Sequence, residues 1–374
     1  MSALRNLVDK LKPTFTKGGK LGFLESTFDA FETFLFVPDT TTSKGAHIRD
    51  CNDMKRTMIM VVVALMPALL FGFYNTGYMH FLSQGVQPEF WASLWFGFLK
   101  VLPLIVVSYV VGLGIEFAFA QFRGHEVNEG FLVSGLLIPM IMPVGTPLWM
   151  IALGTAFAVI FGKEVFGGTG MNVFNPALVA RAFVFFAYTP FISGEKVWFA
   201  DDAVSGATAL EQLATSGTMS YSTADAFLGF IPGCVGETST LAILIGAAIL
   251  LFTGVASWRT MSFVFIGGLA MGYFFQALGV TTYPAWEHLI VGGFAFGAVF
   301  MATDPVTSAQ TDKGKYIVGL MTGALAVLIR VVNPAYPEGM MLAILFMNAL
   351  APLVDYCVVE SSISRRKKRV KLVK

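Results

Sequence analysis

A short polar segment, Asp202-Ala203-Val204-Ser205-Gly206-Ala207-Thr208, presents a hydroxyl beside very small residues. Because Gly206 and Ala207 leave Thr208 unshielded, its oxygen is an open acceptor for a bulky group. Asp202 and Ser205 could orient the donor, or a metal, during such a transfer. A plainer interpretation is a polar turn before a helix-like stretch at 209–214, with Ser205 as its N-cap. The residue types alone leave both interpretations open.

Three acidic residues lie in or beside apolar runs: Glu116, Asp304 and Asp355. A charge at the centre of a bilayer costs roughly 2.5–3.5 kcal/mol on insertion scales, so it usually faces a cavity or a partner. One interpretation places these acids at the membrane surface or in ion pairs, with Arg181 and Arg330 as counter-charges. The other is that they bind or pass Na+, a hard cation that prefers oxygen ligands.

Glycines mark two further places. Gly112 and Gly114 lie within a turn of Glu116, so a narrow notch could form there, and close helix packing is the alternative. The stretch Gly167-Gly168-Thr169-Gly170 lacks the Gly-Lys-Ser/Thr ending of a P-loop. We interpret it as flexible backbone at a broken helix, where exposed amides line a cavity.

The cysteines and histidines are too scattered for a metal site. Neither type shows the spacing of a zinc, haem or CxxC motif. Any redox centre must therefore be organic or shared with a partner. The residues concerned are Cys51, Cys234, Cys357, His47, His80, His125 and His288.

Composition indicates that lipid surrounds most of this chain. It is 55% hydrophobic and only 13% charged, with a mean hydropathy of +0.69, whereas soluble domains are about 25% charged. The net charge of +1 arises from charges at the two ends and in short loops, so we expect no nucleic-acid partner.

Ten apolar runs predict an all-α polytopic membrane protein of about ten transmembrane helices. A span needs roughly 20 residues. The runs at 130–143 and 148–162 are short and lie beside Pro139, Pro143 and Pro147, which predicts broken helices there. The other runs are 57–74, 91–119, 171–189, 238–256, 260–279, 287–303, 315–332 and 340–358.

Loop charges predict the topology. Basic residues in the N-terminal arm, 1–56, and in the tail, 359–374, place both termini in the cytoplasm, and acidic residues place the loop 190–237 outside. This loop separates two five-helix units, 57–189 and 238–358. Phe174–Val179 in the first unit faintly matches Met347–Pro352 in the second, which suggests two inverted repeats.

Several motifs resemble one family. The Asp-x-x-Ser-Gly-Ala-Thr run is similar to the flavinylation signature of membrane subunits of bacterial Na+-translocating NADH:quinone oxidoreductase and of their Rnf relatives. Across the whole chain, the sequence resembles the B-subunit family of that complex. The other matching stretches are Asn128–Phe131, Gly162–Asn172, Asn175–Phe183 and Ala302–Thr307.

The resemblance implies cofactors. It implies FMN joined to Thr208 by a phosphoester, made by a flavin transferase outside the cytoplasm. It also implies a non-covalent riboflavin, for which loops such as 167–170 are candidates. Electrons would pass from NADH, through these flavins, to quinone, and Na+ would move outward.

The resemblance also implies site residues and partners. Glu116, Asp304 and Asp355 would handle sodium, and the region of Gly112 and Gly114 would contact quinone. In the family the two glycines are adjacent, whereas here Leu113 separates Gly112 from Gly114. The family's sensitivity to inhibitors that bind this quinone region is therefore not expected to carry over unchanged. The partners would be the A, C, D, E and F subunits of the complex in the bacterial inner membrane.

Two other functions remain possible at this stage. One is the D subunit of an Rnf ferredoxin:NAD+ oxidoreductase, although the arm at 1–56 is more similar to the quinone reductase. The other is a solute channel or transporter with a urea-channel-like fold. A channel would not need the Ser-Gly-Ala-Thr motif, and fold analogy is a poor guide to function.

Overall fold

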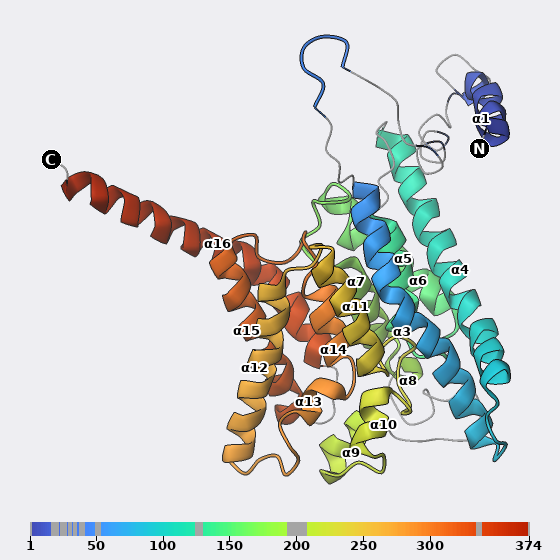
Figure 1. The fold of residues 1–374 in the computed structure, drawn as a ribbon, viewed down its shortest axis with the longest axis vertical. Helices are drawn as coiled ribbons and strands as arrows, with labels where there is room; N and C mark the ends of the chain where they lie inside the picture. The colour runs from blue at the N-terminus through green and yellow to red at the C-terminus, as the bar shows by residue number, and fades with distance from the viewer. Residues whose placement is uncertain are drawn as a thin grey trace.

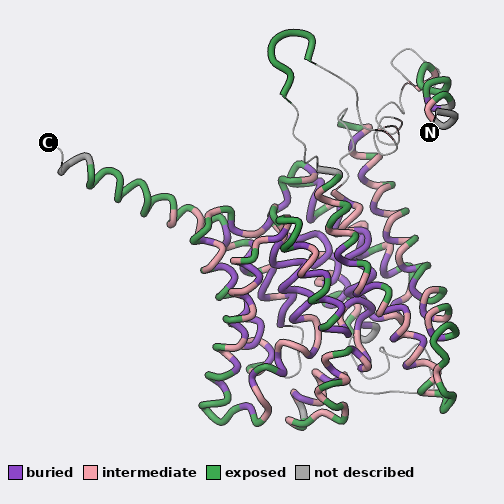
Figure 2. Tube along the Cα trace, viewed as in Figure 1, coloured by how far each residue is buried: buried purple, intermediate pink, exposed green. Residues whose placement is uncertain are grey.

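The structure is a computed structural model. It describes residues 2–15, 22, 28, 32, 36, 42–48, 54–123, 130–192, 208–333 and 339–372. All regular structure in these residues is helical. The helices gather into one body whose centre is buried, and Figure 2 shows exposed residues around its outside. The predicted all-α class is therefore confirmed.

Within the described part of the chain, six helices are long and apolar enough to cross a membrane. Their outer faces carry large exposed apolar side chains such as Val110, Phe274 and Phe346, as expected of a surface in contact with lipid. The six, drawn in Figure 1, are α3 (Met54–Ser83), α4 (Phe90–Arg123), α6 (Leu148–Gly162, continued by the 3-10 turn Glu164–Phe166), α12 (Trp258–Ala277), α15 (Asp312–Val332) and α16 (Gly339–Leu372).

Shorter elements lie between the long helices. Three of them are apolar helices: α5 (Phe131–Met140), α7 (Pro176–Ala187) and α11 (Thr240–Phe252). With the six long helices they account for nine of the ten predicted spans. The remaining short elements are α1 (Ser2–Phe15), α8 (Thr189–Ile192), α9 (Ala209–Ser216), α10 (Thr223–Leu228), α13 (Glu287–Ile290), α14 (Phe294–Phe296) and the π-helix η3 (Gly297–Met301).

The one predicted span not yet accounted for, 287–303, is interrupted. Helix α13 ends at Ile290, Val291 is extended, and Gly292 takes a φ of +68° that favours glycine. The chain then continues through α14 into the π-helix. A break of this kind needs protein around it to satisfy its backbone, and this segment is buried. The total of ten spans stays a prediction.

Glycines hold several helix pairs in backbone contact. Gly246 on α11 lies against the Ala64 carbonyl of α3, and Gly339 on α16 lies against the Ala326 carbonyl of α15. A Cβ added to Gly97 on α4 would collide with the carbonyl of Phe73 on α3. A Cβ added to Gly323 on α15 would collide with the carbonyl of Val264 on α12. Small residues at these crossings allow the close approach that stabilises helix pairs in membranes.

The two ends of the body differ in what they carry. Both chain termini lie at one end, at the top of Figure 1, and α9 and α10 lie at the opposite end. The described part of the basic tail is an exposed continuation of α16 that extends away from the body (Figure 2).

Candidate functional site

Thr208 directly precedes the first residue of α9. Its side-chain oxygen accepts a hydrogen bond from the Glu211 main-chain nitrogen at 3.2 Å, so Thr208 is the N-cap. The helix starts at Ala209, as the sequence predicts, but its cap is Thr208 rather than Ser205. The other motif residues, Asp202, Ser205, Gly206 and Ala207, lie outside the described residues.

The surroundings of Thr208 fit a phosphoester. The residue is half-buried at the end of the body opposite the termini, so its oxygen is not sealed in the core. The first-turn N–H groups of α9 point toward it, and a helix N-terminus favours a phosphate. Behind it, Ala209 and Leu213 pack with Ile231 and Val291 in a small apolar cluster, which anchors the helix.

Glu116 lies at the other end of the body, in an ion pair. On the buried stripe of α4 its carboxylate accepts a hydrogen bond from Lys163 Nζ, and both side chains are about 95% buried. Next to it, Arg123 Nη2 donates to the Glu164 carbonyl at 2.8 Å. These contacts join α4 to the turn that follows α6.

Gly112 and Gly114 face in different directions. Gly112 shares the buried stripe with Glu116, and a Cβ there would overlap the ring of Phe131. Gly114 is exposed, and a Cβ there would meet nothing. The notch beside Glu116 is therefore filled by Phe131, whose ring also lies 5.9 Å from Lys163 Nζ. Only Gly112 belongs to the Glu116 cluster.

Asp304 is held by Asn175 at the start of α7. Asn175 Nδ2 donates to Asp304 Oδ2 at 3.1 Å, while Asn175 Oδ1 accepts from the main-chain nitrogens of Ala177 and Leu178. Asp304 also accepts from Val306 N at 3.0 Å and Thr307 Oγ1 at 3.2 Å. Burial raises the pKa of the Asp304 carboxyl, and these hydrogen bonds act in the opposite direction.

Lys163, Asn175 and Asp304 all line one pocket, which we call the inner pocket. Its volume is about 100 Å³ as space for water-sized groups, and about 800 Å³ when its open mouth is included. Apolar walls come from α3, α5 and α11 and from Phe300. The polar lining includes Thr169, Asn172 and Thr303. Thr169 Oγ1 is buried without a hydrogen-bond partner, so the lining can still bind a polar ligand atom.

Asp355 has a different environment. Its carboxylate accepts hydrogen bonds from Gln310 N at 2.7 Å and from Thr311 N at 3.0 Å, and it also accepts from the Thr311 hydroxyl. Thr311 is the N-cap of α15. Asp355 therefore ties α16 to the loop that contains Asp304, and it does not line the inner pocket.

Sequence reasoning did not identify the roles of Lys163 and Asn175. Arg181 and Arg330 were the expected counter-charges, but Arg181 Nη1 donates to the Ile141 carbonyl and Arg330 Nη1 to the His288 carbonyl, both at 2.7 Å. Lys163 is the ion partner of Glu116. The signal for Lys163 and Asn175 was their place in the family-like stretches 162–172 and 175–183.

Comparisons with known proteins agree with the resemblance. The family described as NQR2, RnfD, RnfE matches residues 41–364. A protein of Chromohalobacter salexigens is 47% identical over 98% of this chain and 96% of its own length. One of Klebsiella pneumoniae is 46% identical over 98% and 99%, and one of Pseudomonas aeruginosa is 45% identical over 97% and 98%. All three are named as the B subunit of Na(+)-translocating NADH-quinone reductase.

Proposed function

This chain belongs to the NQR2, RnfD, RnfE family, and we propose that it is the flavin-carrying membrane subunit of a Na+-translocating NADH:quinone oxidoreductase. The observation that carries the proposal is the identity of 45–47%, over nearly the full length, to relatives named as the B subunit of that enzyme. The partners would be the A, C, D, E and F subunits in the bacterial inner membrane, with both termini in the cytoplasm.

Thr208 is the proposed attachment point of FMN. Its open, half-buried position and its place at a helix N-terminus both support a phosphoester there. In this arrangement, the N–H groups of α9 orient the phosphate, and Ala209 and Leu213 fix the helix on the body. A flavin transferase acting outside the cytoplasm would reach this end.

The inner pocket is the proposed site of riboflavin. Its apolar walls would pack against a flat ring, and Thr169, Asn172 and Asn175 would hydrogen-bond the ring edge and the ribityl chain. The unpaired Thr169 hydroxyl supports a polar ligand. Bound flavins supply electron transfer, and the protein supplies their binding and orientation.

The acidic residues divide by environment. Asp304 lines the inner pocket. Glu116 does not line it but forms an ion pair with Lys163, which does, so both acids are proposed to take part in Na+ handling. Asp355 is proposed to act through the loop that it holds. We propose that quinone contacts the region of Gly112 and Gly114, where Gly114 leaves open space on the outer face of α4.

Covalent flavin on Thr208 is tested by a Thr208→Val variant, expressed with the flavin transferase. Wild-type chain should give a fluorescent band in a denaturing gel, because the phosphoester survives unfolding. The variant band should be dark, because valine has no hydroxyl. A fluorescent Thr208→Val band would reject this attachment site, and a dark wild-type band would reject covalent flavin.

The D subunit of an Rnf complex is the alternative within the family. The three relatives, all named for the quinone reductase, favour the first proposal. Co-purification decides between them: the proposed partners oxidise NADH with quinone, whereas an Rnf complex would transfer electrons between ferredoxin and NAD+.

A further inference from the structure

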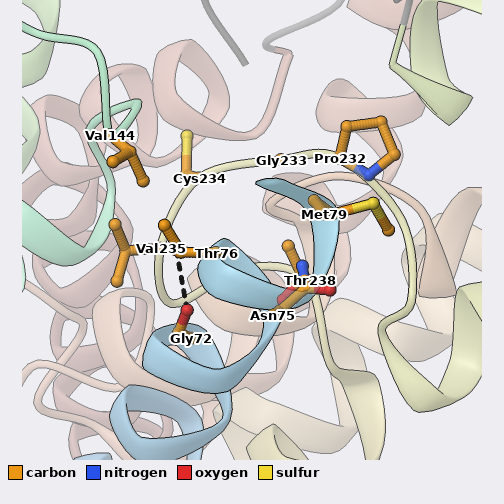
Figure 3. Close-up of a pocket in the computed structure, with 10 residues that line it drawn as sticks. All are labelled: Gly72, Asn75, Thr76, Met79, Val144, Pro232, Gly233, Cys234, Val235 and Thr238. Carbon is orange, nitrogen blue, oxygen red and sulfur yellow. Dashed lines mark hydrogen bonds between the residues drawn. The ribbon is translucent and has the colours of Figure 1, made fainter. Parts of the chain in front are cut away.

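A second, much smaller pocket lies between the two halves of the chain, near the end that carries α9. We call it the outer pocket. On one side is the C-terminal part of α3, and on the other is the loop 229–239 between α10 and α11 (Figure 3). A Cβ on Gly72 would collide with the Val235 carbonyl, so helix and loop are in backbone contact here.

The outer pocket is the size of one water molecule or one small ion. Its volume is about 10 Å³ as space for water-sized groups, and about 320 Å³ when its open mouth is included; a water needs roughly 10–15 Å³ on the first measure. None of the residues that line it carries a positive charge, and none is a carboxylate. Its polar atoms are amide, hydroxyl and main-chain groups, and the Cys234 thiol and the Met79 thioether also line it.

Two deeply buried oxygens in this pocket have no hydrogen-bond partner among the residues that the structure describes. They are Asn75 Oδ1 and Thr238 Oγ1, on residues only 5% and 4% exposed. Unpaired buried polar atoms are costly, at roughly 1–3 kcal/mol each, and native proteins usually give them a partner. Two such atoms around one cavity indicate a shared ligand.

The pocket presents acceptors. Asn75 Nδ2 donates a hydrogen bond to the Ile231 carbonyl at 3.0 Å. The other end of the same amide, Oδ1, can therefore act only as an acceptor or as a ligand to a cation. The Thr76 hydroxyl donates to the Gly72 carbonyl at 2.8 Å, as drawn in Figure 3, so its remaining lone pairs are free to bind. Such a set of neutral oxygens suits a dehydrated cation.

We propose that the outer pocket binds a single dehydrated Na+ ion through Asn75, Thr76 and Thr238. The inference rests on the proposed function for the choice of Na+, and on the geometry for the site. The pocket joins α3 of the first five-helix unit to the loop before α11 of the second. An ion there would link the two units near the outer end of the body.

The first experiment measures the Na+ concentration that gives half-maximal NADH:quinone activity in the complete complex. Thr238→Val removes one oxygen ligand with little change in volume. We expect the half-saturating Na+ concentration to rise about tenfold, equivalent to about 1.4 kcal/mol. Thr238→Ser keeps the oxygen and should behave as wild type.

Thr155→Val is the matched control. Thr155 on α6 is also fully buried with an unpaired hydroxyl, but it does not line the outer pocket. Its half-saturating Na+ concentration should not change. An unchanged value in Thr238→Val complex that carries both flavins would overturn the proposal and leave a bound water as the occupant.

A second measurement needs neither a variant nor activity. Wild-type complex is crystallised with Tl+ replacing Na+, and an anomalous peak between Asn75 and Thr238 is expected. No peak there would overturn the site even if Thr208 carries flavin. A peak in protein without covalent flavin would instead retain the site and reject the proposed function.

Discussion

The end of the body that contains Thr208 and the end that contains the inner pocket hold polar groups in opposite ways. Thr208 caps an eight-residue helix, half-buried and beside the surface. Lys163, Glu116 and Asn175 are each at least 95% buried and connect separate helices. A covalent cofactor needs an accessible hydroxyl for the enzyme that attaches it, whereas a non-covalent one needs enclosure. Function and stability should therefore be separable at the first end and coupled at the second.

The largest effect on stability is expected from Lys163→Met. It leaves the Glu116 carboxylate buried without its partner, and breaking a buried pair in this way costs about 3–5 kcal/mol. Thermal unfolding of the purified complex should show a large drop in Tm.

The double variant Lys163→Met with Glu116→Gln should recover most of that loss, since no charge is left unpaired. Arg259→Ala is the exposed control: its pair with Asp312 is 33% and 65% exposed, and such pairs contribute about 0–1 kcal/mol. A Lys163→Met complex as stable as wild type would contradict the buried pair.

A smaller effect, and one that involves cofactor, is expected from Asn175→Ala. The change removes the cap of α7, worth about 0.5–2 kcal/mol, together with the donor to Asp304. Riboflavin should be lost while covalent FMN is retained. Acid extraction measures the first flavin, and denaturing-gel fluorescence the second.

Ser239→Ala is the matched control for Asn175→Ala. It removes the cap of another buried helix, α11, and Ser239 itself does not line the inner pocket. Its riboflavin content should equal that of wild type. If both variants lose riboflavin equally, the loss reflects stability rather than a contact with the ligand.

The smallest effect on stability is expected from Thr208→Asn. Asparagine is as good an N-cap as threonine, so α9 should remain intact and the free energy of unfolding should stay within about 0.5 kcal/mol of that of wild type. Covalent flavin should nevertheless be absent from the denaturing gel. A clear drop in Tm would show that the two ends are less different than proposed.

Much of the helical pattern could be predicted from sequence. The runs at 260–279 and 315–332 correspond closely to α12 and α15 because uninterrupted apolar stretches of span length have few alternatives. The run at 287–303 does not, since Gly292 breaks it in a way that hydropathy does not register. The short runs near Pro139 and Pro147 form α5 and α6. The prediction that both are too short to span comfortably is wrong for α6, because this helix and its 3-10 continuation, Leu148–Phe166, are long and apolar enough to cross a membrane.

The candidate sites were predictable only in part. Thr208 lies in a local motif, and its helix begins where the sequence indicated. The partner of Glu116, however, is 47 residues away, and Asn175 contacts an acid 129 residues away. Such pairings depend on how helices pack, which residue type and spacing do not specify. The resemblance marked these stretches without assigning them roles.

The glycine contacts between helices also constrain movement. Where a helix backbone rests directly on its neighbour, no side chain lies between them that could change rotamer and let them slide. Helices α3, α4 and α11 should therefore move as one rigid unit, and α12, α15 and α16 as another. Any opening that exposes an ion to one side of the membrane and then the other must then bend the short interrupted elements, above all the segment from α13 to the π-helix at Gly297–Met301.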